Sequence, residues 1–171
     1  MPGDLEETLA PGALREAVAR LALDKARAVA ARLGQSEGTI LGADTIVVID
    51  GEALGKPAGP DEARAMLRRL RGREHDVITG VAVVDAATGR AETTVVVSRV
   101  RMADYREAEI EAYVATGEPL DKAGAYAIQG AGGVLVAGLE GSFTNVVGLP
   151  LAETARLLAA FGVPVSALAA G

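Results

Sequence analysis

The sequence contains no cysteine and a single histidine, His75. Without thiols, the chain can form no disulfide, no thiolate metal site and no cysteine nucleophile. One imidazole is too few for the usual zinc ligand sets, and most histidine-based catalytic triads are excluded as well. Any catalytic chemistry must therefore be sought among the other polar side chains.

Long apolar runs and an excess of positive charge are also missing. No run approaches the roughly 20 apolar residues that a membrane-spanning helix needs. The opening stretch MPGDLEETLAPG has neither a basic start nor an apolar signal segment, so we expect a cytoplasmic protein. The 23 Asp and Glu residues outnumber the 17 Lys and Arg residues. The net charge of −6 disfavours nonspecific binding to nucleic acid or to an anionic membrane, and an anionic ligand would need a local cluster of cations.

The common nucleotide-binding fingerprints do not occur either. The sequence has no Walker A pattern, and no G-x-G-x-x-G pattern follows a predicted strand. It therefore predicts neither a P-loop nor a Rossmann fold.

The order of apolar and polar residues predicts an α/β fold. With 171 residues, half of them apolar and without repeats or linkers, we expect a single domain over residues 1–171. At least two adjacent strand pairs should be hairpins, so the sheet should be mixed rather than purely parallel, with flanking helices. The predicted helices lie at 11–33, between 59 and 72, between 104 and 117, and at 151–161. The predicted strands lie at 39–49, 52–56, 76–84, 93–101 and 134–139.

In the first helix, Lys25 continues an apolar stripe, since it follows Leu21 by four residues and precedes Val29 by four. Its stem should therefore point inward. Two interpretations stay open: a lysine that follows the edge of the apolar face with its ammonium in water, or a cation at the wall of a cleft. The other members of the stripe are Leu14, Val18, Ala22 and Leu33.

The stretch ILGADTIVVIDGEALGKP, residues 40–57, places Asp44 at the entrance of a β-branched apolar strand. A carboxylate there is costly unless it is paired or hydrogen-bonded. Asp44 could bond backbone N–H groups at the strand entrance, ligate a hard divalent cation or act as a general base on water. Thr45 should face the other side of the strand and can offer one hydroxyl to a ligand.

The Asp50-Gly51 pair predicts a tight turn that returns the chain toward the strand entrance. With a two-residue turn, Lys56 lies opposite Thr45 and on its face, whereas one bulge would move it to the face of Asp44. Lys56 is either an edge-strand lysine that discourages aggregation or a cation beside a ligand.

The segment GEPLDKAGAYAIQGAGG, residues 117–133, interleaves Asp121, Lys122 and Gln129 with five glycines. Glycine lets a backbone approach a ligand closely. Backbone N–H groups bind phosphate, and an amide such as that of Gln129 can read a base edge. The segment is either a nucleotide-binding loop or an ordinary tight loop that leads into a strand.

Six stretches together resemble the Maf family of nucleoside triphosphate pyrophosphatases, in order and over nearly the whole chain. The resemblance implies an elongated, two-lobed fold of the Maf and ITPase type with a central cleft. It also implies hydrolysis of a nucleoside triphosphate between the α and β phosphates with a divalent cation, usually Mg²⁺. The stretches are LALDKA (21–26), LGADTIVV (41–48), LGKP (54–57), HDVITGVAVV (75–84), YVATGEPLDKAGAYAIQG (113–130) and GSFTNVVGLPLAET (141–154).

The resemblance implies roles for the phosphate-binding residues. Asp44 matches the proton acceptor of the family and could also bind the metal, while Glu7, in DLEET, matches an acidic pair placed near the metal. The matching phosphate-binding cations are Lys25, Lys56 and Lys122. These roles suit a triphosphate, whose roughly four negative charges need cations and a metal around them.

The resemblance also implies a substrate class. Thr45 and Gln129 are similar to the residues of the branch that prefers dTTP and UTP over the branch that takes 7-methyl-GTP. A hydroxyl and an amide suit the small polar edge of a pyrimidine. We expect a dTTP and UTP pyrophosphatase that removes unwanted nucleotides from the pool. We expect neither a nucleic-acid nor a membrane partner, and the chain could form a homodimer. The alternative is a nucleotide-binding regulator or pseudoenzyme linked to cell division arrest.

One part of the family pattern is not found. Family members begin with a strand and a turn of the form SxSPRR, whose serine and arginines grip the phosphates, and the sequence has no such stretch. We expect either a true start upstream of Met1 or a chain that lacks the first strand and its anion clamp. The second case would reduce transition-state stabilisation.

Overall fold

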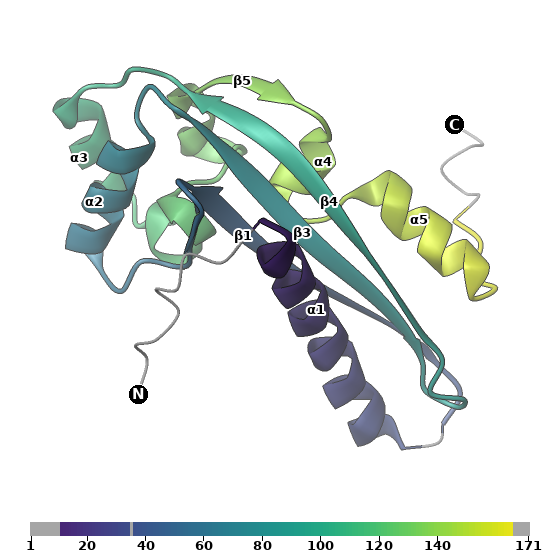
Figure 1. The fold of residues 1–171 in the computed structure, drawn as a ribbon. Coiled ribbons are helices and arrows are strands. Elements are labelled where there is room, and N and C mark those ends of the chain that lie inside the picture. Colours follow the sequence, from purple (N-terminus) through teal and green to yellow (C-terminus); the bar gives the residue numbers. More distant parts are fainter. Residues whose placement is uncertain (1–10, 35, 166–171) are drawn as a thin grey trace.

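The computed structural model describes residues 11–34 and 36–165, which form an α/β fold built on one sheet (Figure 1). Helix α1 covers one face of the sheet, and the other face carries the larger core, with α2 and α3 at one end of the long strands. The helices are α1 (Pro11–Leu33), α2 (Pro60–Leu70), α3 (Glu107–Ala115), α4 (Phe143–Val147) and α5 (Leu151–Ala160). The strands are β1 (Thr39–Ile49), β2 (Glu52–Leu54), β3 (Glu74–Asp85), β4 (Ala91–Met102) and β5 (Val136–Glu140).

The sheet has the strand order β2-β1-β3-β4-β5, and every strand pair in the described residues is antiparallel. The α/β class is confirmed, but the predicted mixed sheet is wrong. Two hairpins, β1–β2 and β3–β4, supply two of the four pairings. The connection through α2 brings β3 back beside β1 in the opposite direction, so the parallel pairing expected of a mixed sheet does not form. The two lobes and the single domain over residues 1–171 stay predictions.

The predicted turn between β1 and β2 is confirmed. Asp50 and Gly51 have φ values of 53° and 76°, and Ile49 pairs with Glu52, so two residues close the hairpin without a bulge. Positive φ at both positions is typical of the turn that best matches the twist of a hairpin. Because β2 ends at Leu54, the described strands leave the outer edge of β1 unpaired before Val47.

Helix α1 buries a narrower stripe than the sequence predicts. Leu21, Val29 and Leu33 are 48%, 44% and 50% exposed, so their predicted inward orientation is wrong. The backbone of α1 lies directly on Gly42 and Gly80; a Cβ at Gly80 would lie 2.5 Å from Val18 O. Small side chains are needed where a helix approaches a sheet so closely. The buried stripe therefore consists of Leu14, Val18, Ala22 and Ala26.

Two further boundaries differ from the predicted ones. Helix α3 begins at Glu107 rather than at Asp104, because the backbone N–H of Arg106 donates to the carboxylate of Glu109 over 2.6 Å. Strand β5 begins after a short 3-10 helix, Gly130–Leu135, which occupies the start of the predicted strand. None of the helices within residues 11–34 and 36–165 has the length and apolar character needed to cross a membrane.

Candidate active site

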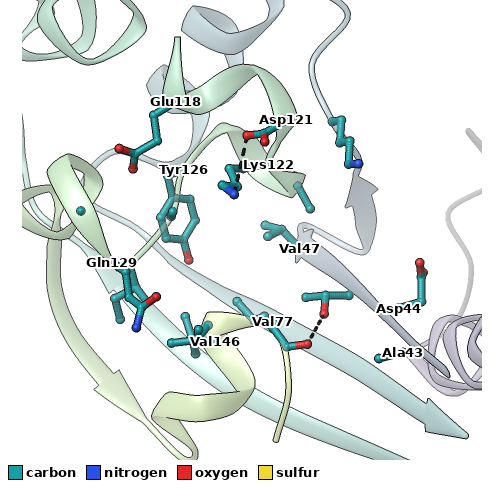
Figure 2. Close-up of a pocket in the computed structure, with 18 of the residues that line it drawn as sticks. Ala43, Asp44, Val47, Val77, Glu118, Asp121, Lys122, Tyr126, Gln129 and Val146 are labelled. Carbon is teal, nitrogen blue, oxygen red and sulfur yellow. Dashed lines mark hydrogen bonds and ion pairs between the residues drawn. The ribbon is translucent and has the colours of Figure 1, made fainter. Parts of the chain in front are cut away.

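A cleft of about 570 Å³ opens beside the unpaired edge of β1. Its walls come from α1, β1, β3, the chain after β2, the segment 118–130 and the end of α4 (Figure 2). All the predicted site residues that fall in the described part of the chain line it: Lys25, Asp44, Thr45, Lys56, Lys122 and Gln129. Glu7 lies outside the described residues. The structure thus brings together residues that are more than 100 positions apart in the sequence.

The distribution of cations supports an anion site. The sequence has only three lysines, Lys25, Lys56 and Lys122, and all three line this cleft. Every arginine falls in the described residues, and none of them lines it. A protein with a net charge of −6 therefore places its lysines at one hollow of its surface. Such a local cluster is what a polyanionic ligand needs.

Lys25 and Asp44 form an ion pair at the cleft wall, and the Lys25 ammonium also lies 3.5 Å from Ala43 O. The side chains are 57% and 19% exposed, so Lys25 does not point inward as predicted but crosses from α1 to the strand edge. The cleft interpretation of Lys25 agrees with this position. Gly80 is the β3 partner of Asp44, and it allows the helix to lie close enough for the pair to form.

Thr45 faces the opposite side of β1, as predicted, and its hydroxyl is held at the cleft floor. Thr45 Oγ1 lies 2.9 Å from the hydroxyl of the fully buried Thr79 and donates over 3.5 Å to Gly148 O. Helix α4, which ends just before Gly148, is anchored by Asn145, whose Nδ2 donates to Val77 O over 3.1 Å. The network fixes both the hydroxyl and the α4 end of the cleft.

Lys56 and Lys122 approach the cleft through neighbouring segments. The N–H of Gly124 donates to Gly55 O over 3.1 Å, which joins the Lys122 segment to the chain just before Lys56. Within the described residues Lys56 forms no ion pair, whereas Lys122 lies 3.6 Å from Asp121 Oδ1. Since β2 ends at Leu54, the predicted strand register of Lys56 does not apply, and the residue lies beyond the hairpin ladder.

The sequence did not single out the aromatic and acidic wall of the cleft. Tyr126 and Glu118 line it, together with an apolar surface of Val47, Val77 and Val146 (Figure 2). Tyr126 is almost fully buried, and its hydroxyl lies 2.6 Å from His75 Nε2. The only sequence signal for this wall was that Glu118 and Tyr126 lie in the glycine-rich segment 117–133, which also contains Lys122 and Gln129.

The buried histidine makes stability depend on pH. Burial lowers the pKa of His75 from 6.5 to about 4, and the nearby Asp76 opposes this only in part. Between these values the unfolded chain binds a proton that the folded chain does not, so stability falls as pH decreases from 6.5 toward 4. We expect the wild-type free energy of unfolding to fall by about 3 kcal/mol more than that of His75→Gln over this range. Urea unfolding of both proteins at several pH values measures the difference, and parallel curves would contradict the burial argument.

The donor set of the cleft fits a hard divalent cation shared with a ligand. Asp44 and Asp121 line the cleft, but the described residues contain no cluster of three metal-ligating side chains. Mg²⁺ is commonly held by one or two carboxylates and by substrate phosphates rather than by a complete protein cage. Asp44, at the strand edge beside the lysines, is therefore a suitable protein ligand for a metal that arrives with a polyphosphate.

The described residues form an α/β protein with a cleft that is lined by three lysines and by the carboxylate of Asp44. The chain belongs to the Maf family: the family model described as "Maf-like protein" matches residues 1–161. It is similar to a protein of Moorella thermoacetica named "dTTP/UTP pyrophosphatase", with 56% identity over 157 residues, 92% of this chain and 78% of that protein.

Two further relatives carry the same name, "dTTP/UTP pyrophosphatase". The Myxococcus xanthus protein is 53% identical over 164 residues, which cover 95% of this chain and 81% of the relative. The Pelotomaculum thermopropionicum protein is 50% identical over 167 residues, which cover 96% of this chain and 86% of the relative.

Proposed function

We propose that the protein hydrolyses dTTP and UTP to the nucleoside monophosphate and pyrophosphate. The observation that carries this proposal is the gathering of all three lysines around one cleft that also holds Asp44, Thr45 and Gln129. The names of relatives that share at least half of their aligned residues with the chain point to the same substrates. The reaction would remove unwanted nucleotides from the cytoplasmic pool.

In this proposal the substrate lies along the cleft. Gln129 and Asp44 lie at well-separated places on its wall (Figure 2), which allows the base and the reacting phosphate to be bound by different groups. The triphosphate lies near Lys25, Lys56 and Lys122, where cations balance its charge. The base extends toward Gln129, whose amide and the Thr45 hydroxyl can bond a pyrimidine edge.

Asp44 acts as the general base. It accepts a proton from a water molecule as the water oxygen bonds to the α-phosphorus, and the bond from that phosphorus to the β-phosphate oxygen breaks. Pyrophosphate leaves, and the ammonium of Lys25 keeps the carboxylate oriented at the strand edge. Asp44 would also hold the divalent cation, which supplies neutralisation of charge on the phosphate oxygens.

Two measurements on the same protein test this function. Pyrophosphate release with Mg²⁺ should be fastest with dTTP and UTP among the common nucleoside triphosphates. Acylation of amines, followed by mass spectrometry, should show that dTTP protects the three lysines. Equal rates with all nucleotides, or protection of the lysines without pyrophosphate release, would contradict the proposal.

A further inference from the structure

We propose that Tyr113 and Glu118 position Gln129 for recognition of the base, a role that rests on the function proposed above. Gln129 lies in residues 126–129, which belong to no helix or strand. Its place in the cleft therefore depends on contacts other than helical or sheet hydrogen bonds. The phenol of Tyr113 and the carboxylate of Glu118 provide these contacts on both sides of it.

The pair bonds the backbone before and after Gln129. The Tyr113 hydroxyl donates to Glu118 Oε1 over 2.9 Å and accepts the N–H of Ala127 over 3.0 Å. Glu118 Oε1 also accepts the N–H of Gly132 over 3.4 Å. Two backbone amides that flank Gln129 are thus joined to one phenol–carboxylate pair.

The loop is shaped closely around this pair. Tyr113 is 4% exposed, and burial raises the pKa of its phenol, so the hydroxyl stays protonated and able to donate. A Cβ at Gly132 would lie 2.5 Å from the Tyr113 hydroxyl oxygen, and one at Gly130 would lie 3.1 Å from Glu118 Oε2. A real Cβ atom does not lie as close as 2.5 Å to another heavy atom, so only glycine at position 132 lets the backbone approach the Tyr113 hydroxyl this closely.

In Figure 2, Glu118 lies away from Asp44, beside which the proposed function places the phosphate that is attacked. Glu118 and Gln129 lie on the same side of the cleft, apart from Asp44 (Figure 2). Glu118 and Tyr113 therefore act through the loop, as positioning residues. Loss of their contacts should weaken substrate binding and leave the chemical step nearly unchanged. KM should therefore rise while kcat stays close to the wild-type value, as expected when an interaction equally strong in the ground state and the transition state is lost.

The test compares wild type with Tyr113→Phe, which keeps the ring and removes only the hydroxyl. Exchange of the Ala127 amide, followed by NMR, should be at least about tenfold faster in the variant. The KM for dTTP should rise about three- to tenfold with little change in kcat, the size expected from one buried hydrogen bond. Unchanged exchange at Ala127 or an unchanged KM would overturn the proposal.

Tyr105→Phe is the matched control, because the Tyr105 hydroxyl is also buried and donates to Leu67 O, away from the cleft. It should lower stability without a change in the KM for dTTP. Glu118→Gln keeps an acceptor oxygen and should retain the wild-type KM, whereas Glu118→Ala should resemble Tyr113→Phe. A similar KM in Glu118→Gln and Glu118→Ala would overturn the role of the acceptor.

A double variant tests whether Tyr113 acts through Gln129. In a Gln129→Ala protein, the additional change Tyr113→Phe should raise the KM for dTTP no further, since coupled residues are not additive. An equal rise in both backgrounds would overturn the proposal. If the wild-type protein releases no pyrophosphate, the proposed function fails, whereas the exchange measurement tests the loop contacts independently of turnover.

Discussion

Asp44→Asn should reduce kcat for dTTP by about a hundred- to ten-thousandfold, because the amide cannot accept the proton of the attacking water. The substitution nearly preserves the shape of the side chain at the edge of β1. It also removes one negative charge beside the cleft lysines, and saturating Mg²⁺ offsets the weaker metal binding of the amide, so KM should change less than kcat. Steady-state kinetics of pyrophosphate release at saturating Mg²⁺ measures kcat and KM separately.

Asp24→Asn is the control for this substitution. Asp24 is the neighbour of Lys25 on α1, is exposed and does not line the cleft. The same chemical change there should leave kcat at the wild-type value. If Asp44→Asn loses no more activity than Asp24→Asn, Asp44 is not the general base.

Lys56→Met should raise the KM for dTTP by about ten- to a hundredfold, the equivalent of losing a hydrogen bond to a charged group worth about 1.5–3 kcal/mol. Lys56 has no acidic partner among the described residues, so its charge is available for the phosphates. Methionine keeps most of the length of the stem. The variant should also show a weaker dependence of KM on salt, because one screened attraction is lost.

Arg20→Met separates this effect from a change in net charge. Arg20 is exposed on α1 and does not line the cleft. Its loss should leave the KM and its salt dependence as in the wild type. Equal effects of the two substitutions would mean that the overall charge of the protein, rather than Lys56, governs substrate binding.

Most helices, strands and turns could be predicted from the sequence, because the residues that favour each of them lie close together in the chain. The β-branched apolar run of β1, the Asp50-Gly51 turn and the four inward residues of α2 depend on neighbours within a few positions. The direction of β3 relative to β1 depends instead on how distant parts of the chain pair, and the sheet was wrongly expected to be mixed. The buried stripe of α1 was also misjudged, because it depends on how closely the backbone of α1 approaches Gly42 in β1 and Gly80 in β3. The periodicity of α1 itself does not show that close approach.

The candidate site shows the same division. Asp44 and Lys25 could be selected as candidates because a charge beside an apolar strand or on an apolar stripe costs free energy unless it is paired or hydrogen-bonded. Their mutual ion pair was not predictable, since it depends on how closely α1 approaches the sheet. The contacts of Tyr113 with Glu118 and Ala127 were also missed, because periodicity marks that tyrosine only as a core residue of α3.

The position of bond cleavage tests the central claim most directly. Hydrolysis of dTTP in water labelled with heavy oxygen, followed by mass spectrometry of the products, shows which phosphorus the water attacks. Attack on the α-phosphorus, with Asp44 as the base, predicts labelled dTMP and unlabelled pyrophosphate. Label in pyrophosphate, or release of dTDP and inorganic phosphate, would contradict the account.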